Sequence, residues 1–178
     1  IPSFFIRQCA KQLYIPLTLI FNRSIQTGVF PTDWKKAKIT PVFKNGSKTD
    51  IKNYRPISLL SFFSKVFECV IYPHLYNHVS HQLTSSQHGF IRKRSTNTNL
   101  IDYVETLYEY MDRQIQVDVI YTDISKAFDK VNHDLLILKL SEFGLGEQML
   151  CWFDSYLKNR NSYVVVNNSE SSYFTAKS

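Results

Sequence analysis

Two long segments, residues 4–27 and 61–79, carry apolar side chains at every third or fourth position. This spacing predicts two amphipathic helices, and Gly28 is a plausible stop for the first of them. Pro16 should break or kink that first helix, because proline lacks the backbone N–H that a helix interior needs. The apolar face of each helix must be covered by other elements, so the chain cannot fold as isolated helices.

The segment Lys38–Phe43 is typical of a short strand, and Pro41 marks it as an edge or bulged strand. Asn45-Gly46 then predicts a turn, since both residue types tolerate positive φ. Both helices and strands are expected along the chain, so the predicted fold class is α+β. The other expected elements are a helix from Thr96 or Asn97 to about Met111, a strand over Val117–Tyr121, helices over Asp134–Glu142 and Glu147–Leu157, and a hairpin of Tyr163–Val166 and Ser172–Thr175 around Asn167-Asn168.

The composition is that of a folded intracellular protein. An apolar fraction of 44% over 178 residues is enough for a hydrophobic core. The three cysteines are scattered and form no Cys-x-x-Cys pair, which indicates reduced thiols. His74, His78 and His81 could share a helix face, but no cysteine or acid completes a zinc site there. No apolar stretch approaches the length of a membrane span, so we expect a protein of the nucleus and cytoplasm without a membrane partner.

The charge is unevenly distributed between the two parts of the chain. Residues 1–100 hold 14 Lys and Arg against 3 Asp and Glu, a balance of +11. Residues 101–178 hold 7 against 12, a balance of −5, and the two balances sum to the net charge of +6. A basic part followed by a part rich in carboxylates favours nucleic acid or nucleotides as partners, although a generally soluble basic surface would give the same count.

A run of strand-forming residues over Val117–Thr122 ends on Asp123, and a second acid, Asp129, follows six residues later. An aspartate at the end of a buried strand can hold Mg²⁺, because the strand fixes its backbone and the cation prefers hard oxygen ligands. The same residue could instead cap the turn into the next helix, and the spacing alone does not separate these roles. For Asp129 the spacing favours a place in the first turn of a helix, where an acid interacts well with the helix dipole.

Five segments in order along the chain resemble one family of proteins. The segment Thr122–Val131 (TDISKAFDKV) is similar to motif A of the reverse transcriptases of non-LTR retrotransposons, of the LINE or jockey-like type. The other four segments are similar to further blocks of that family, and ordered blocks over nearly the whole chain are a specific signal. They are Trp34–Lys44 (WKKAKITPVFK), Asn53–Leu60 (NYRPISLL), Gln87–Phe90 (QHGF) and Trp152–Arg160 (WFDSYLKNR).

The resemblance implies roles for single residues. Asp123 would be the catalytic carboxylate that binds Mg²⁺, and Ile124 would add its main-chain carbonyl. Phe128 would screen the sugar of the incoming nucleotide, although a side chain beside Ala127 would otherwise be read as core packing. Arg55 would contact the triphosphate of the deoxynucleotide, assisted by Lys44, since a guanidinium suits phosphate geometry.

The basic run Arg92-Lys93-Arg94 follows the QHGF block and would contact template phosphates, unless it is only a soluble loop. The expected partners are an RNA template, a DNA primer and deoxynucleoside triphosphates.

The family also uses a later hairpin with an Ala-Asp-Asp block, which this sequence does not contain. We therefore expect a partial right-hand polymerase fold, with a helical fingers region over residues 1–115 and an incomplete palm with an antiparallel sheet over residues 116–178. Such a fragment of an RNA-directed DNA polymerase would be inactive alone, because a single carboxylate holds magnesium poorly. The alternative is a non-catalytic RNA-binding remnant of a decayed element.

Overall fold

The two segments with helical spacing form helices in the computed structural model, which describes residues 3–175. The first segment is divided into α1 (Ser3–Gln8) and α2 (Ala10–Thr27), and the break lies at Cys9. The predicted break at Pro16 is wrong, because α2 continues through this residue at the cost of one backbone hydrogen bond. Gly28 ends α2 as expected, with a left-handed φ of 67°.

The described residues divide into two compact units. The sheet unit contains residues up to 76 and from 128 onward. The α4 unit, named after helix α4 (Thr96–Asp112), contains residues 77–127. This division rests on packing and differs from the expected division into fingers and palm at residue 115, which stays a prediction. Among residues 3–175, no helix is both long and apolar enough to cross a membrane.

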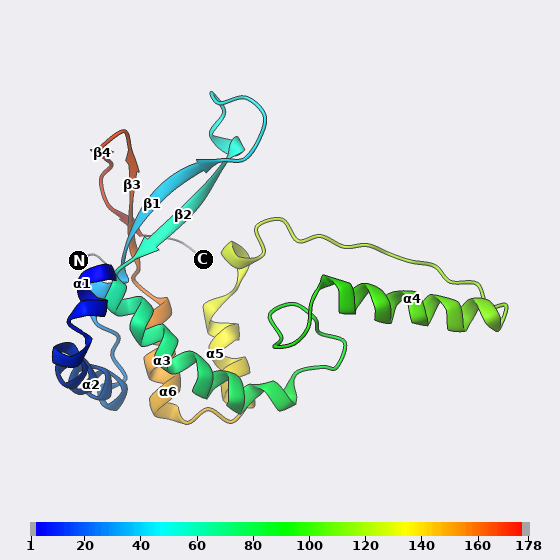
Figure 1. Cartoon of the computed structure of the whole chain (residues 1–178), viewed down its shortest axis with the longest axis horizontal. Coiled ribbons are helices and arrows are strands. Elements are labelled where there is room, and N and C mark those ends of the chain that lie inside the picture. Colours follow the sequence, from blue (N-terminus) through cyan, green and yellow to red (C-terminus); the bar gives the residue numbers. More distant parts are fainter. Residues whose placement is uncertain (1–2, 176–178) are drawn as a thin grey trace. The chain divides into compact units, whose positions relative to one another are not determined.

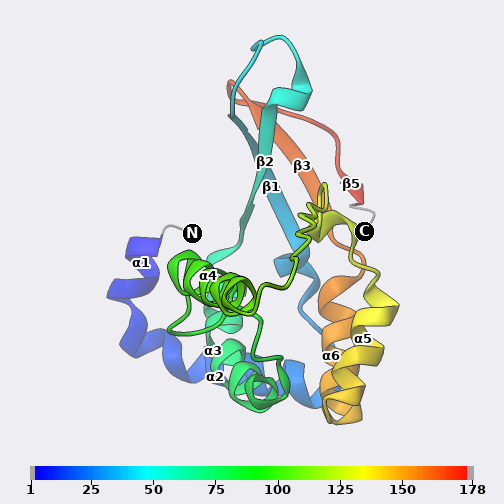
Figure 2. The same ribbon diagram turned by 90° about the vertical axis from the view of Figure 1, so that its right-hand side faces the viewer.

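The sheet unit contains a mixed five-stranded sheet in the order β2-β1-β3-β4, with β5 also paired to β3 (Figures 1 and 2). The long hairpin of β1 and β2 is antiparallel, whereas β1 and β3 run parallel, so the sheet is not the purely antiparallel one expected. The sequence did not predict β2, because a proline in its middle interrupts the strand pattern. The strands are β1 (Lys36–Phe43), β2 (Tyr54–Leu60), β3 (Asn161–Val166), β4 (Ser169–Glu170) and β5 (Phe174–Thr175).

Two prolines face each other in the long hairpin. Pro41 of β1 lies directly opposite Pro56 of β2. Since neither residue can donate a hydrogen bond, they occupy a position where the N–H would point away from the partner strand. The pairing of β1 with β3 ends at Ile39, so β1 has an open edge on that side at Pro41, in agreement with the predicted edge character.

The second hairpin is confirmed where it was expected. Its turn is Asn167-Asn168, and both asparagines have positive φ, at 48° and 63°. The strand that returns is divided in two: Val165 pairs with Glu170 of β4, and Ser162 pairs with Phe174 of β5. Paired positive φ values are the requirement of a tight turn that matches the strand twist, which is why asparagine serves here.

An aromatic cluster forms the core of the sheet unit, where α2, α3 and α6 meet (Figure 2). Trp152 is 1% exposed, and its Nε1 donates a hydrogen bond of 2.9 Å to Ser24 Oγ. The Ser24 hydroxyl in turn donates to the carbonyl oxygen of Val29 at 2.6 Å, so the indole N–H is buried with a partner. The buried side chains of the core are Phe21, Phe30, Phe67, Ile71 and Trp152.

A partly buried polar network links α3 to α6 beside this core. Glu68 accepts hydrogen bonds from the Ser64 hydroxyl at 3.0 Å and from the Tyr156 hydroxyl at 3.1 Å. Burial, reinforced by the negative charge of Glu68, raises the pKa of Tyr156 to about 12. Lys35 is also buried, and desolvation, assisted by the nearby Arg160, lowers its pKa.

The remaining helices agree closely with the expected ones. The helix α6 has the predicted bounds, and the first helix of the α4 unit begins after Ser95, which forms a capping box with Thr98. The predicted caps Thr96 and Asn97 are therefore wrong by one or two residues. The helices are α3 (Phe62–Val79), α4 (Thr96–Asp112), α5 (His133–Glu142) and α6 (Glu147–Leu157), with 3-10 helices at Thr32–Lys35, Ile51–Asn53, Ser80–Gln82 and Phe128–Lys130.

The strand predicted over Val117–Tyr121 is wrong. The segment after α4 is drawn as a plain tube without a strand arrow (Figure 1), and its residues Ile120 and Tyr121 are 86% and 82% exposed. A strand exists only when its backbone groups pair with a neighbour, and residues 3–175 provide no neighbour for this segment. Its high strand propensity is therefore not realised.

We expect Gly28→Ala to destabilise the sheet unit by about 1–2 kcal/mol, because a Cβ is unfavourable at a left-handed φ. The added methyl group would also lie 3.0 Å from Cys151 Cβ, which is a tight contact. Urea denaturation followed by circular dichroism measures the change. Gly146→Ala is the matched control, since a Cβ there meets no atom within 4 Å. Equal stability of the two variants would contradict the proposed conformational requirement.

Candidate functional site

Lys44 and Arg55 lie on the same face of the long hairpin, near its tip. Arg55 is paired with Val42 across the strands, and Lys44 follows Val42 by two residues. Because side chains alternate between the faces of a strand, Lys44 and Arg55 project in the same direction. The backbone N–H of Lys44 donates to the carbonyl oxygen of Asn53 at 2.8 Å, which extends the hairpin by one more position. The structure thus brings together two of the predicted nucleotide-binding residues.

The same face carries two further lysines, Lys36 and Lys38, which the sequence analysis did not select. Lys38 lies opposite Leu59, in the same alternation as Lys44 and Arg55. Lys36 forms an ion pair of 3.0 Å with Asp33, and this hydrogen-bonded carboxylate raises the pKa of the lysine. Lys36 and Lys38 alternate with other residues in the same way as Thr40 and Val42, and this pattern is visible in the sequence. It places the lysines on the same face as Arg55 only because β2 pairs with β1.

We call this surface the basic face of the hairpin: Lys36, Lys38, Lys44 and Arg55. Exposed apolar side chains lie between these cations, including Ile57 and Leu59 at 43% and 44% exposure. The exposed cations suit a polyanion, and the aliphatic side chains between them can bury apolar parts of its sugars or bases.

The predicted metal-binding residues belong to the other unit. Asp123 and Ile124 are exposed and follow the unpaired segment, whereas Phe128 begins the 3-10 helix η4 (Phe128–Lys130) of the sheet unit. The segment similar to motif A is thus divided between the two units. Residues 3–175 contain no group of three or more His, Cys, Asp or Glu side chains placed to hold a metal ion.

Asp129 lies in the first turn of the 3-10 helix η4, as an acid in the first turn of a helix was expected to, and it does not belong to α5. The N-cap of α5 is Asn132, whose side chain accepts a hydrogen bond from the backbone N–H of Leu135 at 3.0 Å. The acid in the first turn of α5 is Asp134.

The basic run Arg92-Lys93-Arg94 lies on a loop that precedes α4. The Arg94 guanidinium donates to the carbonyl oxygen of Gln87 at 2.9 Å and to that of Ser85. Arg94 is therefore engaged in closing the loop, whereas Lys93 is exposed at a turn with a φ of 64°. The predicted template contact of this run stays a prediction for all three residues.

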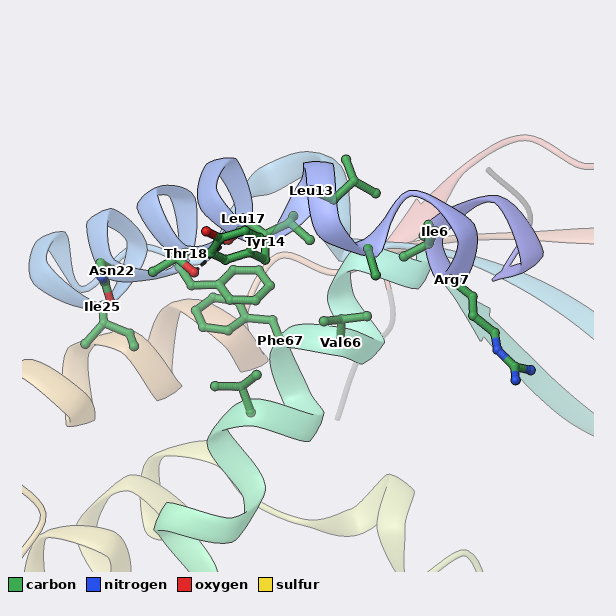
Figure 3. A pocket seen from close by; sticks show the side chains of 13 residues that line it. Ile6, Arg7, Leu13, Tyr14, Leu17, Thr18, Asn22, Ile25, Val66 and Phe67 are labelled. Carbon is green, nitrogen blue, oxygen red and sulfur yellow. Dashed lines mark hydrogen bonds between the residues drawn. The ribbon is translucent and has the colours of Figure 1, made fainter.

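An apolar groove of about 470 Å³ lies between α1, α2 and α3 (Figure 3). Leu13, Leu17 and Val66 are among its lining residues, and Arg7 is the only charged one. The groove provides neither a pair of acids nor a cluster of cations, so its chemistry suits apolar side chains rather than phosphate or metal.

The geometry thus shows a hairpin with a basic face in one unit and an exposed carboxylate, Asp123, in the other. The comparison with protein families is specific: residues 43–178 match the model of the reverse transcriptase (RNA-dependent DNA polymerase). The chain belongs to this reverse transcriptase family. The expected resemblance is confirmed.

The chain is also similar to proteins of mobile elements. It is 33% identical over 170 residues to the RNA-directed DNA polymerase from mobile element jockey of Drosophila melanogaster, covering 94% of this chain and 18% of that protein. It is 32% identical to the probable RNA-directed DNA polymerase from transposon BS of the same species, covering 87% of this chain and 17% of that protein. It is 31% identical to the probable RNA-directed DNA polymerase from transposon X-element of Drosophila melanogaster, covering 89% of this chain and 18% of that protein. The chain thus spans less than a fifth of the length of these relatives.

Proposed function

We propose that this chain supplies the fingers and the first part of the palm of an RNA-directed DNA polymerase of a non-LTR retrotransposon. The fingers would be residues 1–115 and the palm would begin at residue 116. The observation that carries the proposal is the basic face of the hairpin, which holds Lys44 and Arg55 on one side of a two-stranded arm. Membership of the reverse transcriptase family supports it.

Arg55 and Lys44 would bind the triphosphate of the incoming deoxynucleotide. A guanidinium donates two parallel hydrogen bonds to phosphate oxygens, and the lysine adds a point charge beside it. Phe128 would occupy the space that a ribose 2′-hydroxyl needs, and a hydroxyl left without room or a partner costs on the order of a few kcal/mol. The Phe128 side chain is 78% exposed, so it is accessible to a nucleotide.

Magnesium fits the residues present only in part. The Asp123 carboxylate and the Ile124 carbonyl are hard oxygen donors of the kind that the cation prefers. Residues 3–175 do not offer a complete set of ligands, so the metal-dependent chemistry belongs to a protein with further carboxylates. When bound, magnesium would stabilise the charge that develops on the transferred phosphate.

A primer-extension assay tests the division between binding and chemistry. The 178-residue chain is expected to bind single-stranded RNA but to incorporate no deoxynucleotide, because a lone carboxylate cannot hold the metal. Incorporation that depends on the template and exceeds that of Asp123→Ala would show that the chain is active alone.

RNA affinity should fall as salt rises, since it would rest on phosphate contacts. Binding that is absent or insensitive to salt would reject the proposed function.

The second candidate is a non-catalytic RNA-binding remnant of a decayed element. The incomplete set of carboxylates among residues 3–175 favours it as much as a fragment of an active enzyme. Joining the chain to downstream palm residues with an Ala-Asp-Asp block, taken from a related element, separates the two. Polymerase activity in the joined protein supports the enzyme, and its absence despite normal folding supports the remnant.

A further inference from the structure

His88 of the QHGF block is held by both of its ring nitrogens. Its side chain is only 7% exposed. Nδ1 lies 3.0 Å from Thr98 Oγ1, and Nε2 lies 3.0 Å from Asp102 Oδ2. Both partners belong to α4, so the ring fastens the loop that precedes α4 onto the first two turns of this helix.

The hydrogen bonds of Thr98 indicate where the protons are. A threonine hydroxyl has one proton to donate and two lone pairs that accept. Thr98 Oγ1 lies 2.9 Å from the carbonyl oxygen of Ser95, which can only accept, so the hydroxyl proton is directed there. Oγ1 also accepts from the backbone N–H of Ser95 at 2.9 Å. The remaining lone pair of Thr98 therefore faces His88 Nδ1, which must carry a proton to complete the hydrogen bond.

The other ring nitrogen meets a carboxylate. An ionised aspartate is an acceptor only, so Nε2 must also carry a proton to bond Asp102. A neutral imidazole has a single N–H and could satisfy only one of these two acceptors. If Thr98 donated to the ring instead, Thr98 Oγ1 and the Ser95 carbonyl oxygen would lie 2.9 Å apart with no proton between them.

We propose that His88 is a positioning residue that acts as an imidazolium clasp, donating to Thr98 and Asp102 and thereby presenting the basic turn Arg92-Lys93 to RNA phosphates. The clasp itself is independent of the proposed function, whereas the presentation to RNA rests on it. The opposite end of the loop is fixed by Arg94, which donates to the carbonyl oxygens of Ser85 and Gln87. The turn is thus anchored before and after its exposed residues.

Acidic side chains of α4 lie on the same side of the ring as Asp102. The polar cavity beside His88, about 670 Å³ in volume, is lined by Asp102, Glu105 and Glu109 of α4. Arg94 is the cation on the same cavity wall and is engaged by the loop carbonyls. Glu109 is already paired with Arg113 at 2.6 Å, so Asp102, at 3.0 Å from Nε2, is the acid that meets the ring.

Nuclear magnetic resonance of the ¹⁵N-labelled 178-residue chain tests the clasp without RNA. At about pH 6, where histidines are commonly charged, we expect two slowly exchanging ring N–H signals from His88. His81 is exposed and should show none, because its ring protons exchange with water. A single protected N–H on His88, or exchange as fast as that of His81, would overturn the proposal.

Two variants then connect the clasp to the turn. His88→Phe keeps a ring of similar size but forms no hydrogen bond, and we expect amide exchange over residues 87–94 to become at least about tenfold faster while α4 stays helical. Asp102→Asn should remove the Nε2–H signal or weaken its protection from exchange. Because this variant keeps the His88 ring, it tests the hydrogen bond even if His88→Phe fails to fold. Unchanged exchange in His88→Phe would reject the clasp.

RNA binding distinguishes failure of the clasp from failure of the proposed function. His88→Phe should weaken the affinity for a single-stranded oligonucleotide by about threefold to tenfold, since the turn would no longer be held in place. If the two ring signals are present and the wild-type chain binds no RNA, the clasp stands and the proposed function fails. If RNA binds equally well to the wild type and to His88→Phe, the presentation of the turn is wrong.

Discussion

Trp152→Ala is expected to lower the free energy of unfolding of the sheet unit by about 3–5 kcal/mol. The indole is 1% exposed and packs edge-to-face against both Phe30 and Phe67, with ring centroids 5.5 Å and 5.1 Å away. Its removal leaves a cavity that these aromatic rings cannot fill by small shifts, and it also leaves the Ser24 hydroxyl without its donor. Chemical denaturation followed by near-ultraviolet circular dichroism measures the loss.

Tyr14→Ala is the matched control for this loss, because Tyr14 is an aromatic residue of the same unit that is 62% exposed. Substitutions at exposed positions usually change stability by less than about 0.5 kcal/mol. Similar effects at Trp152 and Tyr14 would show that the aromatic cluster is not the source of stability. In that case the stability of the sheet unit would have to come from residues outside the aromatic cluster.

Replacing the four cations of the basic face by glutamine is expected to weaken binding to single-stranded RNA by on the order of a hundredfold at low salt. Each phosphate contact contributes about 0.7 to the slope of log affinity against log salt for a single strand. Lys36 is already paired with Asp33 at 3.0 Å, so the other three cations dominate and the slope should fall by about 2. Fluorescence anisotropy at several salt concentrations measures both quantities. The four positions are Lys36, Lys38, Lys44 and Arg55.

A pair of lysines outside the basic face provides the control. Lys139 lies 2.8 Å from Glu142 and Lys158 lies 2.6 Å from Asp154, so both charges are already balanced by neighbouring acids. A double glutamine variant of these lysines should bind RNA nearly as well as the wild type, whereas the double variant of Lys44 and Arg55 should not. Equal losses in the two pairs would mean that only net charge matters and that the hairpin has no particular role.

The sequence predicted most helices because their signals are local. The bounds of α6 were correct, and Gly28 was correctly placed at the end of α2. The strands depended on partners, and two of them were misjudged. Tyr54–Leu60 was missed because its strand character arises from pairing with β1, and Val117–Tyr121 was overpredicted because apolar β-branched residues do not form a strand without a neighbour.

The candidate site was predicted unevenly for the same reason. Lys44 and Arg55 were selected from the family resemblance, and the register of the hairpin gave the physical reason for their common direction. Lys36 and Lys38 were missed because a face of a sheet cannot be read until both strands are known. His88 was noted only as part of the QHGF block, since its hydrogen bonds to Thr98 and Asp102 join residues ten and fourteen positions away.

The opposed prolines of the long hairpin have a consequence for how this arm behaves in solution. An open strand edge with exposed valine and isoleucine is ordinarily a template on which another chain can add and start an aggregate. Pro56 withholds a donor from the outer edge of β2, and Pro41 does the same on the stretch of β1 beyond β3. Each edge of the arm therefore lacks one donor at the same level of the hairpin, which disfavours the addition of further strands and so disfavours self-association.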